Sequence, residues 1–516
     1  MFTPLCTGSV RPTLYRSVGP EPVQNERMQP LDTLYLRVAD AIAASVRAGT
    51  LARAERLPSI RETARREGVS VATVIQAYRT LEDARLIEAR PRSGYYVCAR
   101  PPSVPEPEPS RPPADAVEVE LGRIGADIVR LAHDPRFISF GAACPSEALF
   151  DQDRIRRTVS RALQRHRGSL TSYTVSPGRI ELRRAIARHA LAWGCALDVR
   201  RIAITNGCIE SVTLALRAAT RPGDVVAIES PTYFGLLGIL ESLHLRALAI
   251  PTHPRSGMSV DALRLALETQ PVRAVLSVPT LSNPLGACLP TTERRRLAQL
   301  VAEHDIPLIE DVIYNDLAES DERRRAVKAF DSTGHVMVCG SFTKTVAPGL
   351  RLGFIDGGRW SDRVQALKAS TSGGQTAVLE FALADLLMQP GHESAYRHLR
   401  ATIAASVDEA RGLVAEHFPR GTRVTDPPGG FILWVELPGA VDSVRLFHAC
   451  RAERICIAPG VIFGTGNRYR HCVRLGVGGA WGEPYRAALA RVGAIAAGLQ
   501  SRASSREAAA DPPALA

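Results

Sequence analysis

A run of prolines divides this chain into two parts. Between Pro101 and Pro113, seven of thirteen residues are proline, mixed with Glu, Ser and Arg. Proline fixes φ and has no amide hydrogen, so this run forms neither a helix nor a central strand, and it predicts an extended, stiff linker over residues 99–117. A chain of 516 residues is also too long for one hydrophobic core. We therefore expect a small module at residues 31–98 and a large module at residues 118–500. Residues 1–30 and 501–516 show no periodic apolar pattern and are predicted to be disordered, with Met28 a candidate for the true start.

Composition excludes several classes of protein. No segment approaches the roughly 18 uncharged apolar residues that span a bilayer, and the N-terminus lacks the apolar core of a secretory signal, so we expect no membrane and a cytoplasmic location. The ten cysteines stand singly, without C-x-x-C pairs, which predicts buried free thiols and no metal site. The net charge of +11 permits a polyanionic partner without requiring one.

The small module reads as three helices and a hairpin. An apolar residue recurs at every fourth position of the first helix, at Leu34, Val38, Ile42 and Val46. Ser59 and Glu62 form a capping box for a short second helix, and Ser70 caps a third helix through Asp83. Two short β segments follow, at residues 86–89 and 95–97. This order is typical of a winged helix-turn-helix, an α+β fold.

Three motifs in this module resemble the GntR family of regulators. They are Leu57-Pro58-Ser59-x-Arg61, Val69-Ser70-x-x-Thr73-Val74-x-x-Ala77-Tyr78, and Leu86-Ile87-Glu88 followed by Arg92-Ser93-Gly94. The resemblance implies contacts with double-stranded DNA by Arg61, Ser70, Thr73, Arg79, Arg92 and Gly94. Two positions depart from the family: Arg53-Ala54-Glu55-Arg56 stands where Pro-Gly is usual, and Val71 stands where arginine is frequent, which bears on base specificity. A winged helix that docks protein instead of DNA is the alternative reading.

The large module alternates short apolar runs with helical stretches, as in an α/β fold with a mostly parallel sheet covered on both faces. The runs lie at residues 202–204, 225–228, 274–278, 307–309 and 335–338. Distinctive polar residues follow each run directly. Because the carboxyl ends of parallel strands meet at one edge of a sheet, we expect these residues to gather there.

The residues after the runs suit one cofactor. Gly207 opens a helix, and the free amides of Gly207, Cys208 and Ile209 can hold a phosphate. Asp311 and Lys344 follow neighbouring strands, and Arg351 lies beyond a Pro-Gly turn. Only three of the 64 basic residues are lysine: Lys328, Lys344 and Lys368. Since arginine cannot form a Schiff base, a lysine in this ordered, glycine-rich segment indicates a need for an amine.

Together these motifs resemble the fold-type I, pyridoxal 5′-phosphate (PLP)-dependent aminotransferases, from about Phe140 to Trp481. The resemblance implies that Lys344 forms the Schiff base with PLP, that Asp311 pairs with the ring nitrogen, and that Asn283 and Tyr314 contact the ring hydroxyl. It further implies that Tyr233 stacks on the ring and that Ser341 and Arg351 bind the phosphate. Tyr173, in Ser172-Tyr173-x-x-x-x-Gly178, matches a tyrosine that reaches the partner subunit's phosphate, and Arg474, in Val473-Arg474-Leu475-Gly476, matches one that binds a substrate carboxylate. A solvated surface lysine and a structural salt bridge are the alternatives for Lys344 and Arg474.

A winged helix, a proline-rich linker and an aminotransferase-like domain in one chain resemble the MocR subfamily of GntR regulators. The resemblance implies a head-to-tail homodimer on an operator with two half-sites, whose DNA binding responds to PLP or to its adduct with an amino acid or amine. A working aminotransferase with an accessory winged helix is the alternative, because every residue needed for transamination is present. Whether the chain is an enzyme stays open at this point.

Overall fold

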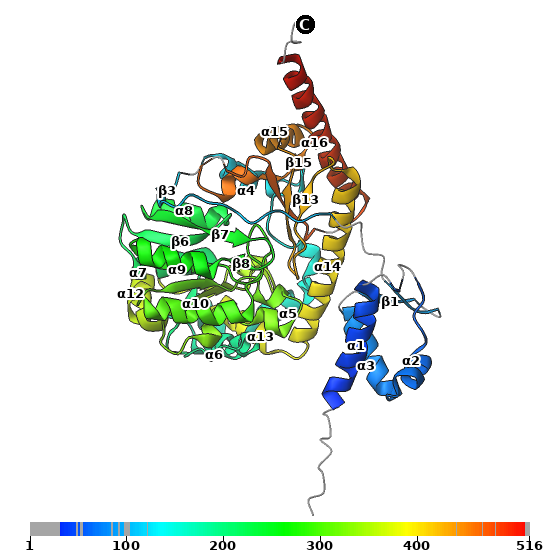
Figure 1. Ribbon diagram of the computed structural model, residues 1–516. Coiled ribbons are helices and arrows are strands. Elements are labelled where there is room, and N and C mark those ends of the chain that lie inside the picture. Colours follow the sequence, from blue (N-terminus) through cyan, green and yellow to red (C-terminus); the bar gives the residue numbers. More distant parts are fainter. Residues whose placement is uncertain are drawn as a thin grey trace, which may run out of the picture. The chain divides into compact units, whose positions relative to one another are not determined.

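The computed structural model describes residues 31–47, 50–51, 55–83, 86–90, 93–97, 104–120, 122–439, 441–466, 468–479 and 481–510. The predictions for residues 1–30, for Met28, for Arg92 and for residues 511–516 lie outside this set. The chain forms two compact units, Met1–Ala99 and Arg100–Ala516 (Figure 1). Each unit is described by itself.

The first unit contains three helices and a two-stranded hairpin, as predicted. The helices are α1 (Leu31–Arg47), α2 (Ile60–Glu67) and α3 (Val71–Asp83), and the strands β1 (Ile87–Arg90) and β2 (Gly94–Val97) pair antiparallel. Apolar side chains from all three helices and both strands form one core. Within it, the hydroxyl of buried Tyr78 donates to the Pro58 carbonyl at 2.8 Å and shares a 2.8 Å hydrogen bond with Thr63. This side chain therefore fixes α3 against α2 and the segment before it.

The second unit is built on a mostly parallel sheet. Its strand order is β3-β7-β6-β9-β10-β11-β12-β5, with the short β8 (Gly257–Met258) paired to β7. The five predicted runs form β5 (Ile202–Thr205), β6 (Val225–Ser230), β9 (Val272–Ser277), β10 (Leu308–Asp311) and β11 (Val336–Ser341). β7 (Arg246–His253) pairs parallel with β6, while β12 (Gly353–Asp356) is antiparallel to both of its neighbours, β11 and β5. Because of this double reversal, β5 runs in the same direction as the parallel strands, and its carboxyl end reaches the same edge.

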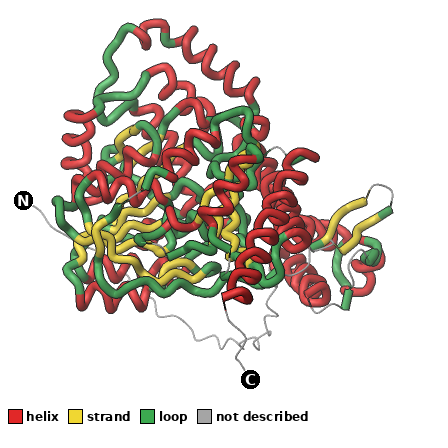
Figure 2. The backbone as a smooth tube through the Cα atoms, turned by 90° about the horizontal axis from the view of Figure 1, so that it is seen from above, coloured by secondary structure: helices red, strands yellow, loops and turns green. Residues whose placement is uncertain are grey.

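Helices cover both faces of this sheet (Figures 1 and 2). Alternate residues of β6 belong to two different cores: Val226 and Ile228 pack with α7 and α8, whereas Val225 and Ala227 pack with α9 and α10. A strand buried on both sides reads as a continuous apolar run, which is why these strands were visible in the sequence. The helices around the sheet are α5 (Gln152–Arg165), α6 (Ile180–His189), α7 (Cys208–Ala219), α8 (Phe234–Ser242), α9 (Val260–Thr269), α10 (Thr291–Glu303), α11 (Asp321–Arg324), α12 (Ser361–Thr371) and α13 (Ala377–Met388).

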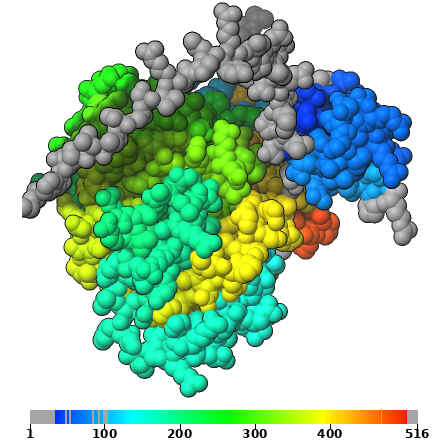
Figure 3. Space-filling view, turned by 90° about the horizontal axis from the view of Figure 1, so that it is seen from below, coloured from blue at the N-terminus to red at the C-terminus, as the bar shows by residue number. Residues whose placement is uncertain are grey.

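A smaller sheet lies in the C-terminal part of this unit. Its order is β13-β14-β17-β16, formed by Arg423–Val424, Ile432–Glu436, Cys472–Gly476 and Ala458–Pro459. Near it, β4 (Ile138–Ser139) pairs with β15 (Ile455–Cys456). The helices of this part are α4 (Ile124–Ala132), α14 (His392–His417), α15 (Ser443–Ala452) and α16 (Glu483–Ala510). Figure 3 shows the cyan and teal surface of α5 and α6 against the yellow surface that includes α13 and α14.

The structure corrects the predicted linker. Residues 104–118 do not form a free spacer but lie along the second unit, where the Ser110 amide donates to the Thr252 carbonyl and Pro105 accepts from the Val424 amide. Ala116 is buried in a core cluster, and β3 (Val117–Glu118) adds to the edge of the large sheet beside β7. Proline content predicts the lack of a helix but says nothing about what an extended segment packs against. Only residues 98–103, which lie outside the described set, separate this segment from the hairpin.

The predicted disordered tail is wrong for residues 501–510, because α16 continues through Ala510. These residues include many alanines together with arginine and glutamate, which are strong helix formers, and a helix can extend on propensity without an apolar stripe. All eight cysteines in the described ranges are free, and seven are buried. No helix of the described residues is both long and apolar enough to cross a membrane.

Candidate functional site

Asp311 ends the parallel strand β10, and its carboxylate is buried at the carboxyl edge of the sheet. The Cys208 thiol donates to Oδ1 at 3.2 Å, and the Ile313 amide donates to the same oxygen at 2.9 Å. Burial raises the pKa of Asp311 to about 6, against the hydrogen bonds from Ile313 and Cys208 and the charge of Lys344, which lower it. Oδ2 accepts no hydrogen bond from the described residues, so the carboxylate is free to bind a proton donor such as a protonated ring nitrogen.

Lys344 lies in the turn after the neighbouring strand β11, half-buried. Burial lowers the pKa of its ammonium group, and the charges of Arg474 and Arg351 lower it further, while Cys144 and Asp311 oppose them. A lowered pKa favours the neutral, nucleophilic amine. The other two lysines are salt-bridged, Lys328 to Asp331 and Lys368 to Glu210. Lys344 has no such partner among the described residues, and its burial argues against a solvated surface lysine.

Arg474 lies on β17 and is 1% exposed. Nη2 donates to the Gly141 carbonyl, Nη1 makes a long 3.5 Å hydrogen bond to Asn283 Oδ1, and the guanidinium carbon lies 5.2 Å from the centre of the Phe463 ring. Nε is buried without a partner, and no described carboxylate pairs with this side chain. Burial accordingly lowers its pKa. A structural salt bridge is therefore not its role, and the unpaired guanidinium can bind the carboxylate of a ligand.

Three further predicted residues lie in the same region. The Asn283 amide is 3.5 Å from the Tyr314 hydroxyl, and both side chains are buried. Burial raises the pKa of Tyr314, on which Tyr233, Arg474 and Asp311 also act electrostatically. Tyr233 precedes α8 and is partly buried, with a pKa raised by burial. The structure thus brings residues from three separate loops, which follow β6, β9 and β10, to one place.

The N-terminus of α7 provides amides beside an arginine. Gly207 caps this helix with φ of 79°, and the amides of Cys208 and Ile209 have no acceptor within the helix. A Cβ atom at Gly207 would lie 3.1 Å from Nη2 of Arg351, so this guanidinium rests directly against the cap. Gly353 is packed as tightly, since its Cβ would lie 2.7 Å from the Gly207 carbonyl carbon. Free amides and a guanidinium in contact suit a phosphate group.

Ser341 is buried at the end of β11, and its hydroxyl is already engaged. It donates to Thr343 Oγ1 at 2.9 Å and accepts from the Thr343 amide at 3.1 Å. The Ser341 hydroxyl also lies 3.3 Å from the Leu352 carbonyl, and whenever it donates to Thr343 the Thr343 hydroxyl proton can point to a ligand. Sequence reasoning did not single out Thr343, although it directly precedes Lys344.

Glu210 is a second residue that the sequence reasoning missed. Its carboxylate accepts hydrogen bonds from the Asn206 amide and the Ser372 hydroxyl. Lys368, which is fully buried, reaches both carboxylate oxygens at 3.1 and 3.2 Å. The network holds the turn that leads into α7. The sequence offered one sign of this network, because Lys368 is one of only three lysines, but it did not show that Glu210 is its partner.

Tyr173 lies away from these residues, in the loop before α6, and is 100% exposed. Leu170 and Val175 beside it are 65% and 71% exposed. These three exposed side chains lie within one short segment, residues 170–175.

In the first unit, Ser70 and Thr73 lie at the N-terminus of α3. The Ser70 hydroxyl accepts from the Thr73 amide at 3.1 Å, and the two hydroxyls share a 2.8 Å hydrogen bond. Ser70 therefore caps the helix, and the Thr73 hydroxyl supports it through the bond to Ser70. Arg61 on α2 and Arg79 on α3 are exposed.

Gly94 begins β2 with φ of 105°. A Cβ there would lie 3.4 Å from Nε of Arg56, which the sequence reasoning noted only as a departure from the family. Arg90 on β1 stacks 4.4 Å from the centre of the Tyr96 ring. Arg90 is also ion-paired with Glu88 at 2.7 Å, so Arg56, which bridges to Tyr96, is the basic residue that the structure adds beside the hairpin.

Comparison with known proteins identifies both units. The family model of bacterial regulatory proteins, gntR family, matches residues 34–97, and that of aminotransferase class I and II matches residues 145–481. The uncharacterized HTH-type transcriptional regulator YjiR of Escherichia coli (strain K12) is 34% identical over 461 residues, covering 89% of this chain and 98% of the relative. The HTH-type transcriptional regulator TauR of Rhodobacter capsulatus is 28% identical over 469 residues, covering 85% and 91%. This chain belongs to the MocR-type regulators of the GntR family.

The large unit of this MocR-type regulator is similar to solved aminotransferases. The multiple substrate aminotransferase of Thermococcus profundus superposes with a TM-score of 0.67 at 23% identity, covering 75% of this chain and 96% of that protein. LysN, the α-aminoadipate aminotransferase of Thermus thermophilus, gives 0.66 at 23% identity, covering 75% and 97%. These likenesses establish the predicted fold, and the class I and II aminotransferase fold supports PLP as the cofactor. The GntR match likewise implies DNA binding.

Proposed function

We propose that this MocR-type regulator binds an operator with two half-sites as a head-to-tail homodimer, and that its large unit senses PLP together with an amino acid or amine. One observation carries the proposal. The buried, unpaired guanidinium of Arg474 lies in the same site as Lys344, an amine without a counter-ion among the described residues. This pair fits a ligand that presents both a carboxylate and an amino group. The regulator would act in the cytoplasm, where its DNA is.

The side chains of the site fit PLP. Asp311 has a free carboxylate oxygen for the ring nitrogen. The lowered pKa of Lys344 favours the neutral amine that reacts with the aldehyde. Arg351 and the amides at the start of α7 would hold the phosphate, with Ser341 and Thr343 at its side. Tyr233 would cover one face of the ring, and Asn283 with Tyr314 would meet the ring hydroxyl. When bound, PLP supplies an electrophilic carbon that reacts reversibly with amines.

The chain's own residues then set the response. Lys344 would be released when an amino compound takes its place, and its freed amine would hold or pass a proton within the site. Arg474 would orient the compound by its carboxylate. A ligand shifts the protein between two arrangements only if it binds one of them better, so the contacts of Arg474 and Lys344 must differ between those arrangements. The change in DNA affinity would follow from that difference.

Tyr173 supports the homodimer. A fully exposed tyrosine among exposed apolar neighbours is suited to a partner surface, and two copies would present two winged helices to two half-sites.

A working aminotransferase is the second candidate, because Lys344 and Asp311 have the environment that transamination needs. The relatives that share nearly the full length of this chain carry regulator names, which makes this candidate the less favoured. Multiple turnovers with an amino donor and a keto acid would support the enzyme.

The decisive experiment measures fluorescence anisotropy of the DNA upstream of the chain's own gene, with and without PLP, across a salt series. Lys344→Ala serves as the matched control, because it keeps the winged helix and removes the amine. We expect sequence-specific binding that PLP changes in the unaltered chain and not in the variant. Equal binding to scrambled DNA, with no effect of PLP, would refute the proposal.

A further inference from the structure

Cys208 connects the two ends of the site at which PLP is expected to bind. It is the first residue of α7, so its backbone amide is one of those suited to the phosphate. Its thiol donates to Oδ1 of Asp311 at 3.2 Å, at the end of β10. Both side chains are buried, with exposed fractions of 6% and 7%. One residue thus contributes to the phosphate end and also touches the carboxylate expected at the ring nitrogen.

The thiol of Cys208 keeps its proton at neutral pH. Burial raises its pKa, and the nearby Asp311 and Cys339 raise it further. An ionised carboxylate has only acceptors, so the thiol supplies the proton of this hydrogen bond. The Ile313 amide donates to the same oxygen at 2.9 Å. With both donors on Oδ1, the oxygen left for a ring nitrogen is Oδ2.

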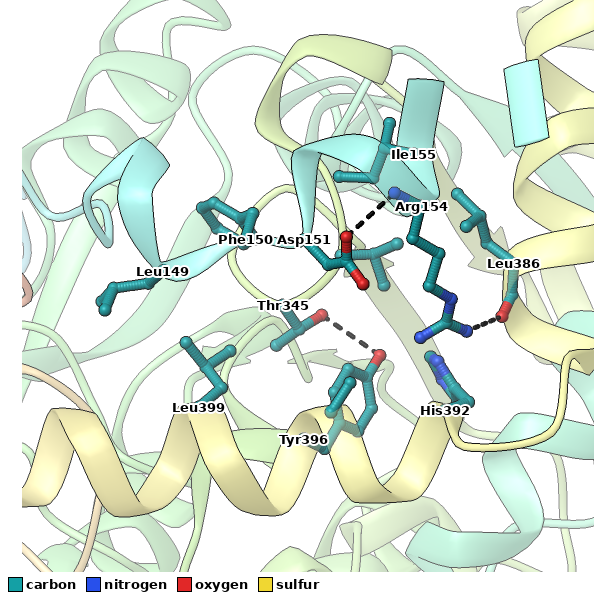
Figure 4. Close-up of a pocket in the computed structure, with 12 residues that line it drawn as sticks. Leu149, Phe150, Asp151, Arg154, Ile155, Thr345, Leu386, His392, Tyr396 and Leu399 are labelled. Atoms are coloured by element: carbon teal, nitrogen blue, oxygen red, sulfur yellow. Dashed lines mark hydrogen bonds between the residues drawn. The ribbon is translucent and has the colours of Figure 1, made fainter. Parts of the chain in front are cut away.

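No other side chain in the described ranges donates a hydrogen bond to Asp311. Lys344 acts on it by charge, and the segment of this lysine is held separately, because the Tyr396 hydroxyl donates to Thr345 Oγ1 at 3.4 Å (Figure 4). A change at Cys208 therefore removes one identifiable donor and leaves the lysine segment its own support. The other titratable groups coupled electrostatically to Asp311 are Glu229, Tyr233, Tyr314 and Cys339.

We propose that Cys208 is a positioning residue for the cofactor: its thiol holds the Asp311 carboxylate with Oδ2 toward the ring nitrogen and stabilises that carboxylate in its ionised form. This inference rests on the proposed function, because bound PLP is the partner of Asp311. A hydrogen bond to the ionised form of an acid favours ionisation, so the proton shared with the ring nitrogen stays on the nitrogen. Since the electron withdrawal that PLP supplies depends on this proton, Cys208 also bears on whether the site only binds amino compounds or turns them over.

The first test needs no cofactor. Infrared difference spectroscopy of the full-length, cofactor-free chain follows the C=O stretch of the protonated Asp311 carboxyl over a pH series, and Asp311→Asn identifies the band. The pKa of Asp311 is about 6 with Cys208 in place. Cys208→Ala should raise the midpoint by about one pH unit, a roughly tenfold change in proton affinity, because a hydrogen bond to a charged group is lost.

Two further variants separate the hydrogen bond from packing. Cys208→Ser keeps a small side chain that can donate, so its midpoint should stay close to that of the unaltered chain. Cys339→Ala is the matched control, because Cys339 lies opposite Asp311 in the register of β10 and β11 and is 0% exposed. Among the described residues its thiol makes no hydrogen bond to Asp311. Loss of this second buried thiol should leave the midpoint unchanged.

The second test reads the cofactor directly. The chain is loaded with PLP that carries ¹⁵N in the ring, and ¹⁵N NMR at pH 7 reports how far the nitrogen is protonated. In Cys208→Ala the resonance should move toward that of an unprotonated pyridine. In Cys208→Ser and Cys339→Ala it should stay at its position in the unaltered chain. A purely structural role of Cys208 would weaken PLP binding without moving this resonance.

The inference is overturned if Asp311 takes up its proton at the same pH in Cys208→Ala as in the unaltered chain. It is also overturned if Cys339→Ala or Cys208→Ser shifts the midpoint as far as Cys208→Ala does, or if the ring-nitrogen resonance of Cys208→Ala does not move. An unaltered chain that takes up no PLP would instead contradict the proposed function. The carboxyl titration would then still decide whether Cys208 keeps Asp311 ionised.

Discussion

Replacing Lys368 by methionine should destabilise the large unit strongly. Its ammonium group is fully buried and lies 3.1 and 3.2 Å from the two carboxylate oxygens of Glu210 and 2.7 Å from the Ser372 hydroxyl. Methionine fills a similar volume without the charge, so the loss is electrostatic. Removing one partner of a buried ion pair leaves the other charge uncompensated and costs about 3–5 kcal/mol. The double variant Glu210→Gln/Lys368→Met removes both charges and should recover most of that loss.

The effect should depend on pH with a defined sign. Burial alone would raise the pKa of Glu210, but hydrogen bonds from Asn206, Ser372 and Lys368 lower it below its ordinary value of 4.5. A carboxylate with a lowered pKa stabilises the fold above its ordinary pKa, and this contribution is lost as the pH falls through its folded value. Without Lys368, its hydrogen bond and its charge no longer lower the pKa of Glu210, which then takes up a proton at a higher pH than in the unaltered chain. The loss in the free energy of unfolding that Lys368→Met causes is therefore largest at neutral pH, and it becomes smaller as the pH falls.

Urea unfolding followed by tryptophan fluorescence measures this directly, because all four tryptophans lie in the large unit. Loss of the Glu210–Lys368 pair should also weaken PLP binding. Glu210 accepts a hydrogen bond from the Asn206 amide at the start of α7, where the phosphate is expected to bind. If the double variant is as unstable as the sum of the two single variants, the pair is not coupled and the reasoning fails.

Three other changes test other parts of the molecule. Asp311→Asn should raise the stability of the cofactor-free chain at pH 7 by about 1–3 kcal/mol while weakening PLP binding, because burial raises the pKa of Asp311 to about 6. In that chain stability rises as the pH falls from about 6 toward 4, and the variant should lose this dependence. Gly353→Ala should cost about 1–3 kcal/mol and weaken PLP binding, because the new Cβ would lie 2.7 Å from the Gly340 carbonyl oxygen and from the Gly207 carbonyl carbon. Ser70→Ala should cost about 1 kcal/mol in the first unit and weaken DNA binding, since Ser70 caps α3.

Each of these three variants can be checked against a control or against a result that would contradict the prediction. Urea midpoints over a pH series check Asp311→Asn, and an unchanged pH dependence would contradict the raised pKa. Gly349→Ala is the control for Gly353, because a Cβ at Gly349 meets no atom within 4 Å. Circular dichroism melting and DNA anisotropy check Ser70→Ala. Ser70→Asn keeps a capping oxygen and should behave as the unaltered chain, so equal losses in both variants would show that the cap is not the cause.

The strands and their polar ends were predictable because each is a local pattern. Strands buried on both faces read as apolar runs, and Asp311 and Lys344 follow two of them directly. Parallel direction then brings the two residues to one edge of the sheet without further information. The winged helix was predictable for a similar reason, since Ser59 and Ser70 mark the starts of its helices within a few residues.

Contacts between distant segments were decided by the tertiary structure alone. The sequence singles out Lys368 as rare, but only packing pairs it with Glu210, 158 positions away. In the same way, only the structure shows that Arg474 lacks a carboxylate partner among the described residues and lies against Gly141 and Asn283. The proline-rich segment gave no sign that it would lie along Thr252 and Val424. The physical reason is that local conformation follows from neighbours in sequence, whereas the pairing of a buried charge depends on which segments the whole core brings together.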